Sequence, residues 1–334
     1  MTSSGYTPVG QYTQLFPPKP GFTEKDLPDL FGKVYIVTGA NAGIGKELSR
    51  ILYSKRAEVY MAGRSKQKIV DAIRDIKNMI SASDVGQLVF LHLDLANLVT
   101  IKASAERFLE RENRLDVLWN NAGVMNPPEG SETEQGYELQ LGVNCIGTFL
   151  FTRLLTPTLI KTTKLEVAGA VRVVWVSSQA IESTWAIREG IDMDNLDYHE
   201  GIPSMTKYCI SKTGSMFYGT EYAKRHAADG ILSVPLNPGL IDTNLWHAQG
   251  KLSHAFLRMF ILHPTVFGAY TELFGGLSPE VTLEKSGQWV IPWGRFQSLR
   301  KDLVAGSRST SEPGGTGTAE RFWDWSEEQV RSYL

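Results

Sequence analysis

Short apolar runs rich in β-branched residues alternate with longer helical stretches along most of the chain. The runs occupy 33–38, 58–62, 87–93, 115–119, 171–177 and 231–236. Apolar residues recur at helical spacing over 44–55, 66–81, 98–113, 134–162 and 205–226. Apolar strands that are separated by helices form a parallel sheet covered on both faces. The alternation therefore predicts an α/β fold with a doubly wound parallel sheet.

The charge balance and the cysteines limit the class of protein. The 334 residues include 34 Lys and Arg against 36 Asp and Glu, a formal net charge of −2. Such a balance lacks the basic footprint of a nucleic-acid-binding protein, so no nucleic-acid partner is expected. The two cysteines, Cys145 and Cys209, cannot form a disulfide framework and lack the clustered spacing of a metal site. They predict a reducing compartment and a cytoplasmic protein without a bound metal.

No segment has the pattern of a secretory leader or of a membrane span. The N-terminus is polar and Pro-rich, without a basic stretch followed by an apolar one. The most apolar stretch, 254–276, is interrupted by Arg258, His263 and Pro264. It falls short of the roughly 18 uncharged residues that a membrane helix needs. No integral membrane span is expected.

The chain is predicted to be a single domain with two appended ends. A low-complexity patch at 306–318 has the composition of a mobile connector. The residues after it predict a short helix in which Trp323 and Trp325 anchor the tail to the body. The expected partition is an N-terminal extension at 1–31, a cofactor-binding catalytic domain at 32–295 and a C-terminal tail at 296–334.

A glycine-rich turn joins the first predicted strand to the first predicted helix. It runs from Thr38 through Gly39, Gly43 and Gly45 to Lys46, with glycines in the spacing G-x3-G-x-G. Glycines allow a tight turn and a close approach of backbone to a pyrophosphate, and the N–H groups and dipole of a helix start favour its charge. Because the turn follows an apolar strand, the sequence predicts dinucleotide binding.

Further motifs follow in a fixed order. They are Asn120-Asn121-Ala122-Gly123, Asn144, Ser178, Tyr208 with Lys212, Pro238-Gly239 and Thr243. With the glycine loop, over roughly residues 32–245, they resemble the short-chain dehydrogenase/reductase family. Within it, Lys46 and the segment GTFLFTRLL are most similar to the retinol-dehydrogenase-like branch and its fungal relatives. The resemblance implies a Rossmann fold and an oxidoreductase that transfers a hydride to or from a nicotinamide cofactor.

Tyr208 and Lys212 are four residues apart, so on a helix they share one face. A neighbouring ammonium is expected to lower the pKa of the phenol. The resemblance implies that Tyr208 donates a proton to the substrate oxygen and that Lys212 assists it and holds the nicotinamide ribose. It further implies that Ser178 binds the carbonyl and that Asn144 orders a water next to Lys212. Ser178 is chosen over the adjacent Ser177 because the family usually places the catalytic serine second.

The end of the second strand favours NADP(H) over NAD(H). An NAD site usually has an acidic residue there, whereas this chain has Gly63, Arg64 and Ser65. A guanidinium pairs with a 2′-phosphate, and Lys46 adds a second cation. With the resemblance, the predicted cofactor-binding positions are Thr38, Gly39, Asn41, Gly43, Ile44, Gly45, Lys46, Arg64, Ser65, Asp94, Leu95, Asn121, Ala122, Gly123, Tyr208, Lys212, Pro238, Gly239 and Thr243.

The segment after the last cofactor motif, about 240–285, is where the family places its substrate lid. It carries Leu245, Trp246, Leu252, Phe256, Leu257, Met259, Phe260, Ile261 and Phe267. An apolar lid indicates a bulky apolar carbonyl or alcohol, in lipid, retinoid-like or secondary-metabolite chemistry. The segment could instead rest on a membrane or on a partner subunit, and Trp185 could line the pocket or the core.

Two other functions stay open at this stage. One is a redox-silent cofactor-binding or scaffold protein, and the other is a non-redox cyclisation or dehydration in the same pocket. The oligomeric state is also open, with a homo-oligomer as one alternative.

Overall fold

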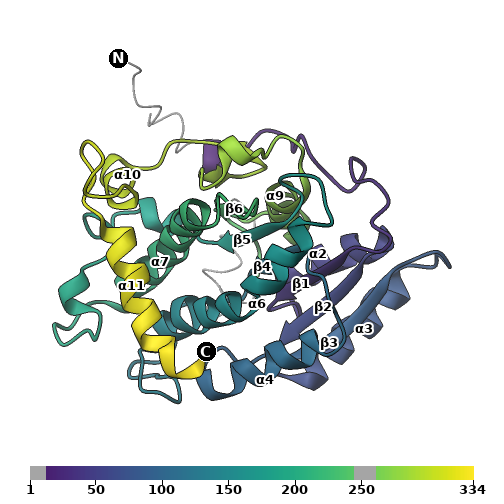
Figure 1. Cartoon of the computed structure of the whole chain (residues 1–334), viewed down its shortest axis with the longest axis horizontal. Helices are drawn as coiled ribbons and strands as arrows, with labels where there is room; N and C mark the ends of the chain where they lie inside the picture. The colour runs from purple at the N-terminus through teal and green to yellow at the C-terminus, as the bar shows by residue number, and fades with distance from the viewer. Residues whose placement is uncertain (1–12, 244–260) are drawn as a thin grey trace.

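The computed structural model describes residues 13–243 and 261–334, and its centre is an eight-stranded sheet. The strands are β1 (Val34–Thr38), β2 (Glu58–Gly63), β3 (Gln87–His92), β4 (Val117–Asn120), β5 (Arg172–Val176), β6 (Leu232–Leu236), β7 (Val290–Ile291) and β8 (Arg295–Phe296). Their spatial order is β3-β2-β1-β4-β5-β6-β7-β8, parallel up to β7 and antiparallel for β8 (Figure 1). This confirms the predicted doubly wound α/β fold. The strand order reverses between β1 and β4, where such folds bind their ligands.

Helices connect successive strands, and further helices follow the last strand of the sheet. The longer ones are α2 (Gly43–Ser54), α3 (Lys66–Met79), α4 (Leu98–Leu109), α6 (Thr148–Thr163), α7 (Ser204–Arg225), α9 (Thr265–Leu277), α10 (Lys301–Ser307) and α11 (Thr318–Val330). The short ones are α5 (Leu139–Leu141), the π-helical η1 (Gly142–Gly147), η2 (Gln179–Glu182), η3 (Met193–Asn195), η5 (Leu283–Lys285) and η6 (Arg331–Tyr333).

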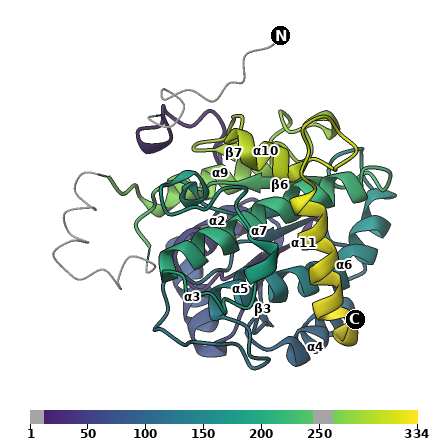
Figure 2. The same ribbon diagram turned by 90° about the vertical axis from the view of Figure 1, so that its left-hand side faces the viewer.

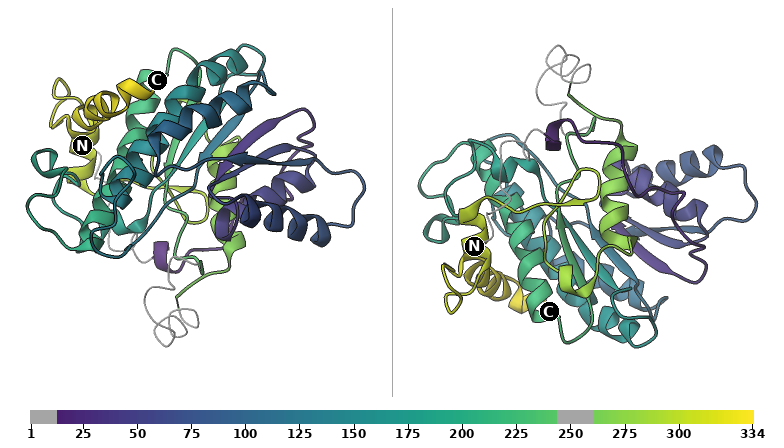
Figure 3. Two further views of the ribbon diagram at one scale, coloured as in Figure 1. Left: turned by 90° about the horizontal axis from the view of Figure 1, so that it is seen from below. Right: turned by 90° about the horizontal axis from the view of Figure 1, so that it is seen from above.

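The central strands β1, β4, β5 and β6 are buried at every position, because most of their side chains are apolar and both faces of the sheet are covered. In β1, Val34 and Ile36 join one core cluster, whereas Tyr35 and Val37 join the other. Helices α4, α6, α7 and α11 contribute to the first cluster, and α2, α3 and α9 contribute to the second. Figure 3 shows these two helical layers on opposite sides of the sheet. Because β1 to β7 are parallel, their carboxyl ends all lie at the same edge of the sheet.

The helix predicted over 134–162 begins later than expected. Gly136, with φ +79°, closes a turn in which its N–H donates to Thr133 O, so the chain is not helical there. The Glu138 carboxylate then accepts from the N–H of Leu141 at 2.9 Å and caps the helix. The helix also widens to a π-helix over η1, which the sequence pattern did not indicate. Wide turns of this kind often occur at functional sites.

Both ends of the described chain pack on the body. Phe22, Leu27 and Leu30 are buried in the cluster beneath α2 and α9. The closing helix was predicted correctly: α11 lies beside α7 in Figure 2, with Trp323 fully covered and Trp325 packed partly against the same core. The extension, domain and tail boundaries themselves stay a prediction.

The segment 306–318 does not match the expected mobile connector. Its first residues complete α10, and the rest folds back on that helix. The N–H of Thr316 donates to Ala305 O at 2.9 Å, and the N–H of Gly317 donates to Arg308 O at 2.9 Å. A low-complexity composition did not reveal these backbone hydrogen bonds.

One helical stretch within the described residues, Leu139–Thr163, is long and apolar enough to cross a membrane. Its most apolar 18-residue stretch is 78% buried inside the protein, as in a core helix. The apolar stretch that the sequence drew attention to, 254–276, ends in α9. This helix contributes Ala269, Leu273 and Phe274 to the core, so 265–277 is not part of a lid. The expected lid residues at 245–260 lie outside the described residues.

Candidate active site

The glycine loop lies at the switch point between β1 and β4. Gly39 has φ +69°, a left-handed conformation that side chains disfavour. A Cβ at Gly45 would come within 2.6 Å of the Asn121 amide nitrogen, which donates to Thr38 O at 2.7 Å. The N–H of Ala122 donates to Thr38 Oγ1 at 2.9 Å. These bonds tie the loop after β1 to the loop after β4, and α2 starts between them without a side-chain cap.

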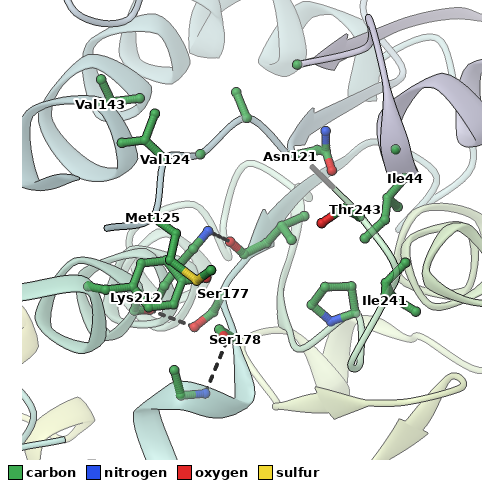
Figure 4. A pocket seen from close by; sticks show the side chains of 18 of the residues that line it. Ile44, Asn121, Val124, Met125, Val143, Ser177, Ser178, Lys212, Ile241 and Thr243 are labelled. Atoms are coloured by element: carbon green, nitrogen blue, oxygen red, sulfur yellow. Dashed lines mark hydrogen bonds between the residues drawn. The ribbon is translucent and has the colours of Figure 1, made fainter. Parts of the chain in front are cut away.

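A cavity of about 950 Å³ opens along the carboxyl edge of the sheet from this loop. Most of the predicted site residues line it; Figure 4 shows part of the wall. Those on the wall are Gly39, Asn41, Gly43, Ile44, Arg64, Asp94, Leu95, Asn121, Ala122, Gly123, Ser178, Tyr208, Lys212, Pro238, Gly239 and Thr243. The structure therefore brings together residues that are as much as 204 positions apart in the chain (from Gly39 to Thr243).

Three predicted positions have structural contacts behind the wall. Thr38 is buried and bonds to Trp119 O and Ala122 N. Gly45 lies against Asn121. Ser65 caps α3 by accepting from the N–H of Lys68. None of the three lines the cavity, so each shapes the site from outside it.

The two cations predicted near a 2′-phosphate differ in position. Arg64 follows β2, is exposed, and lines the cavity. Lys46 does not line it, because its ammonium pairs with Asp75 on α3 at 2.8 Å. The geometry therefore leaves Arg64 as the cation on the cavity wall at this end.

Tyr208 and Lys212 project from the first half of α7 into the opposite end of the cavity. Both are almost completely buried. The Lys212 ammonium donates to Val176 O at 2.8 Å and lies 6.0 Å from the centre of the Tyr208 ring (Figure 4). The end of β5 thus fixes the lysine, and one helical face presents both groups, as the spacing predicted.

The two serines after β5 have different partners. Ser177 Oγ donates to the backbone oxygen of Lys212 at 2.6 Å, so its hydroxyl holds α7 against β5. Ser178 lines the cavity, hydrogen-bonds to the Tyr208 phenol, and accepts from the N–H of Ala180 at 3.1 Å. Both serines line the cavity, but it is the second that hydrogen-bonds to the Tyr208 phenol, whereas the hydroxyl of the first is taken up by the backbone of α7.

Burial controls the pKa of both catalytic candidates. It raises the pKa of Tyr208 to about 12, although the hydrogen bond from Ser178 acts in the opposite direction. Burial also lowers the pKa of Lys212 to about 8. The sequence predicts that the Lys212 ammonium lowers the pKa of the phenol; in this arrangement desolvation is the largest effect, and the net shift is upward. The tyrosine therefore stays protonated at neutral pH.

Asn144 lies behind the catalytic pair, in the π-helical turn η1. Its amide donates to Val124 O at 3.0 Å and to Ser211 Oγ at 2.9 Å, and it accepts from the N–H of Val124 at 2.8 Å. A Cβ at Gly123 would lie 3.1 Å from Lys212 Nζ and 3.2 Å from Asn144 Oδ1. Asn144 does not line the cavity, but its oxygen and the lysine ammonium both lie against Gly123.

A buried carboxyl group faces this region from the other side of the sheet. Glu272 on α9 is completely covered, and neither carboxyl oxygen has a hydrogen-bond partner. Burial raises its pKa to about 8, and the charge of Lys212 acts to lower it. Sequence reasoning missed Glu272. The signal was a single acid within the apolar segment 265–277.

Much of the cavity is apolar. Its wall includes side chains that the sequence did not single out: Leu15, Val124, Met125, Leu139, Val143, Met205, Leu240 and Ile241. Trp185 is neither on this wall nor in the core, since 53% of it is exposed. The expected aromatic lid does not supply the described wall.

The cysteines and the acidic residues give no sign of other chemistry. Cys145 and Cys209 are buried free thiols, as the sequence predicted, and burial raises the pKa of both. Within 13–243 and 261–334, no group of three or more His, Cys, Asp or Glu side chains could hold a metal ion.

Known proteins with similar sequences and folds agree with this geometry. Residues 33–188 match the family model described as short chain dehydrogenase. The chain is 53% identical over 327 residues to a short-chain dehydrogenase/reductase of Phomopsis amygdali, covering 97% of each. It is 46% identical to short-chain dehydrogenase/reductase bet4 of Neocamarosporium betae, over 99% of this chain and 96% of the relative. An uncharacterised Mycobacterium paratuberculosis protein of known structure is 27% identical, with a TM-score of 0.65, 93% of this chain and 98% of that one covered.

Proposed function

This chain belongs to the short-chain dehydrogenase/reductase family of oxidoreductases, and we propose that it transfers a hydride between NADP(H) and a bulky apolar carbonyl compound or alcohol. One observation carries the proposal. Ser178, Tyr208 and Lys212 line the same cavity as the glycine loop that starts α2. A proton donor and a pyrophosphate site are thus connected within one space of about 950 Å³.

The residues of the cavity fit a nicotinamide dinucleotide. Side chains would fill the cradle at Gly39, where a Cβ would approach Ala122 Cα to 3.0 Å, and at Gly123, where it would meet Lys212. The N–H groups of the α2 start would hold the pyrophosphate. Asp94, Leu95 and Ala122 would line the adenosine side, and Thr243 would lie at the nicotinamide end. When bound, the cofactor supplies or accepts the hydride.

Arg64 supports a preference for the phosphorylated cofactor. It lies on the cavity wall next to Gly63, at the end of β2 where an NAD site would have an acid. A charge-assisted hydrogen bond from its guanidinium to a 2′-phosphate has no counterpart in NADH. Lys46 is a weaker candidate because Asp75 already pairs with it.

The protein's part in the chemistry is to move one proton and to hold the reacting oxygen. In the reductive direction, Tyr208 Oη donates its proton to the carbonyl oxygen as that oxygen gains negative charge. Ser178, which hydrogen-bonds to the same phenol, shares the oxygen with Tyr208. The Lys212 ammonium stabilises the phenolate that remains, and Asn144 holds the adjoining backbone around Gly123.

The substrate class follows from the wall. Val143, Met205, Leu240 and Ile241 line the same cavity as Tyr208 with aliphatic and thioether groups, which gain affinity by burying carbon surface. We propose a hydrophobic ketone or secondary alcohol of secondary metabolism, acted on in the cytoplasm.

The test is to incubate the purified protein with a panel of hydrophobic ketones and either NADPH or NADH, and to follow the cofactor absorbance. The proposal expects turnover with NADPH, its loss in Tyr208→Phe, and normal turnover in Tyr53→Phe, a tyrosine of α2 that does not line the cavity. Consumption of substrate without oxidation of NADPH would support non-redox chemistry instead. Binding of NADPH without any turnover of the panel or of the matching alcohols would support a redox-silent protein.

A further inference from the structure

The N-terminal segment Thr13–Leu15 lies at the cavity. The buried residues that follow it in the sequence, Phe22, Leu27 and Leu30, belong to the core. Leu15 lines the same wall as Ser178 and Tyr208. The segment contacts η2, which directly follows Ser178, and the loop after β6. These elements stand two and three strands away from the glycine loop in the sheet order β1-β4-β5-β6. The segment therefore belongs to the substrate end of the cavity, not to the adenosine end.

Gln14 fixes the segment through a buried polar network. The side chain is 1% exposed, and its amide nitrogen donates to Glu182 Oε2 at 2.8 Å. Its amide oxygen accepts from Asn237 Nδ2 at 2.9 Å. Asn237 in turn accepts from the N–H of Gly239 at 2.9 Å. Gln14 thus bridges η2 and the residue that follows β6, and any residue without both a donor and an acceptor would leave buried polar groups unpaired.

The backbone on either side of Gln14 is held as well. The Arg295 guanidinium donates to Thr13 O at 2.7 Å and to Thr13 Oγ1 at 3.2 Å. The Nε2 of His263 lies 3.2 Å from Leu15 O. Both anchors come from parts of the chain that follow β6. Contacts to four separate elements orient Leu15 toward the cavity and give it one defined position.

We propose that Leu15, positioned by Gln14, is a specificity-determining residue that limits how far an apolar substrate extends beyond its carbonyl group. The N-terminal segment is then a fixed piece of the substrate wall and not only a peripheral extension. The inference deepens the proposed function, on which its kinetic readout rests. The matching substrate has an aliphatic or aromatic group at the end remote from the reacting oxygen, because Leu15 offers only carbon surface there.

The test uses the full chain with a series of straight-chain methyl ketones of increasing length. Leu15→Trp should lower kcat/KM for the longest ketones relative to the shortest by about tenfold, because the larger ring fills the end of the pocket. Leu15→Ala should shift the preference toward longer or branched ketones. Gln14→Ala should change the preference in the same direction as Leu15→Ala, because the segment loses its anchor. The control is Phe16→Ala, an adjacent residue that does not line the cavity.

NADPH affinity, measured by fluorescence, should be the same in all four variants. Binding of the same ketones, measured by displacement of the dye 8-anilinonaphthalene sulfonate, gives a second readout that needs no turnover. If both Leu15 variants are active and keep the chain-length preference of the wild type, the inference is overturned and the proposed function stands. If the protein shows no turnover but the Leu15 variants bind ketones with a changed chain-length preference, the role of Leu15 in the substrate wall is supported and the proposed function is contradicted. Unchanged binding preference in an inactive protein would overturn both.

Discussion

Replacing the buried Glu272 by Gln should change how the stability of this protein depends on pH. The carboxyl group is fully covered and lacks a hydrogen-bond partner, so the folded protein keeps it protonated. Its pKa is raised from 4.5 to about 8. A raised pKa means that the stabilising contribution is complete below 4.5 and is lost as the pH rises through about 8.

The size of this change in the free energy of unfolding follows from the one proton that the Glu272 carboxyl binds. Between the two pKa values the unfolded carboxyl is ionised and the folded one is not, so the free energy of unfolding falls by about 1.4 kcal/mol per pH unit. From about pH 5 to about pH 7.5 the loss is about 3 kcal/mol. Lys212, whose pKa is lowered to about 8, begins to lose its proton only near the top of this range, and the wild type and the variants share that contribution. Glutamine has nearly the same shape as glutamic acid but cannot titrate.

The assay is reversible urea unfolding of the wild type, Glu272→Gln and the control Glu280→Gln, an exposed carboxylate beyond α9. Other titrating groups are common to the three proteins and cancel in the differences. We expect Glu272→Gln to gain about 3 kcal/mol relative to the wild type from pH 5 to pH 7.5, whereas Glu280→Gln should follow the wild type. Parallel curves for Glu272→Gln and the wild type would refute the assignment of a protonated buried acid.

Three further predictions concern the cavity. Arg64→Ala should weaken NADPH binding by about 1.5 to 3 kcal/mol and leave NADH binding nearly unchanged, with Arg74→Ala as the control; equal losses for both cofactors would contradict the 2′-phosphate site. Tyr208→Phe should keep NADPH affinity and lose at least about 10²-fold in kcat, and retained turnover would show another proton donor. The reduction rate should fall as the pH rises through about 8, the pKa of Lys212, and that limb should disappear from the residual activity of Lys212→Met. A limb that persists in Lys212→Met would belong to another group.

The sequence predicted those features that depend on local pattern. Each of the six strands expected from β-branched runs occurs, and Tyr208 and Lys212 share one face of α7 because their spacing fixes that geometry. The strands β7 and β8 were missed, since two residues are too few to show a pattern. The late start of the helix after Gly136 depended on a single turn.

Features that depend on tertiary contacts could not be predicted. The pKa of Tyr208 is set by how completely α7 is buried, which no spacing reveals. Lys46 on α2 pairs with Asp75 on α3, so this predicted cofactor-binding residue does not line the cavity. Leu15 lines the cavity in a segment that contacts from Gln14, Arg295 and His263 tie to distant elements. In each case the determining partner is remote in the sequence.

The central claim is that hydride passes between a nicotinamide cofactor and a carbonyl carbon beside Tyr208. The most direct measurement uses NADPH that carries deuterium at both C4 positions of the nicotinamide with a hydrophobic ketone, followed by mass spectrometry of the product. The wild type should give an alcohol one mass unit heavier than the unlabelled product, with the label on the carbinol carbon. Tyr208→Phe, although it binds NADPH, should give almost none. A product without the label, formed at the wild-type rate, would contradict hydride transfer and place this cavity in another chemistry.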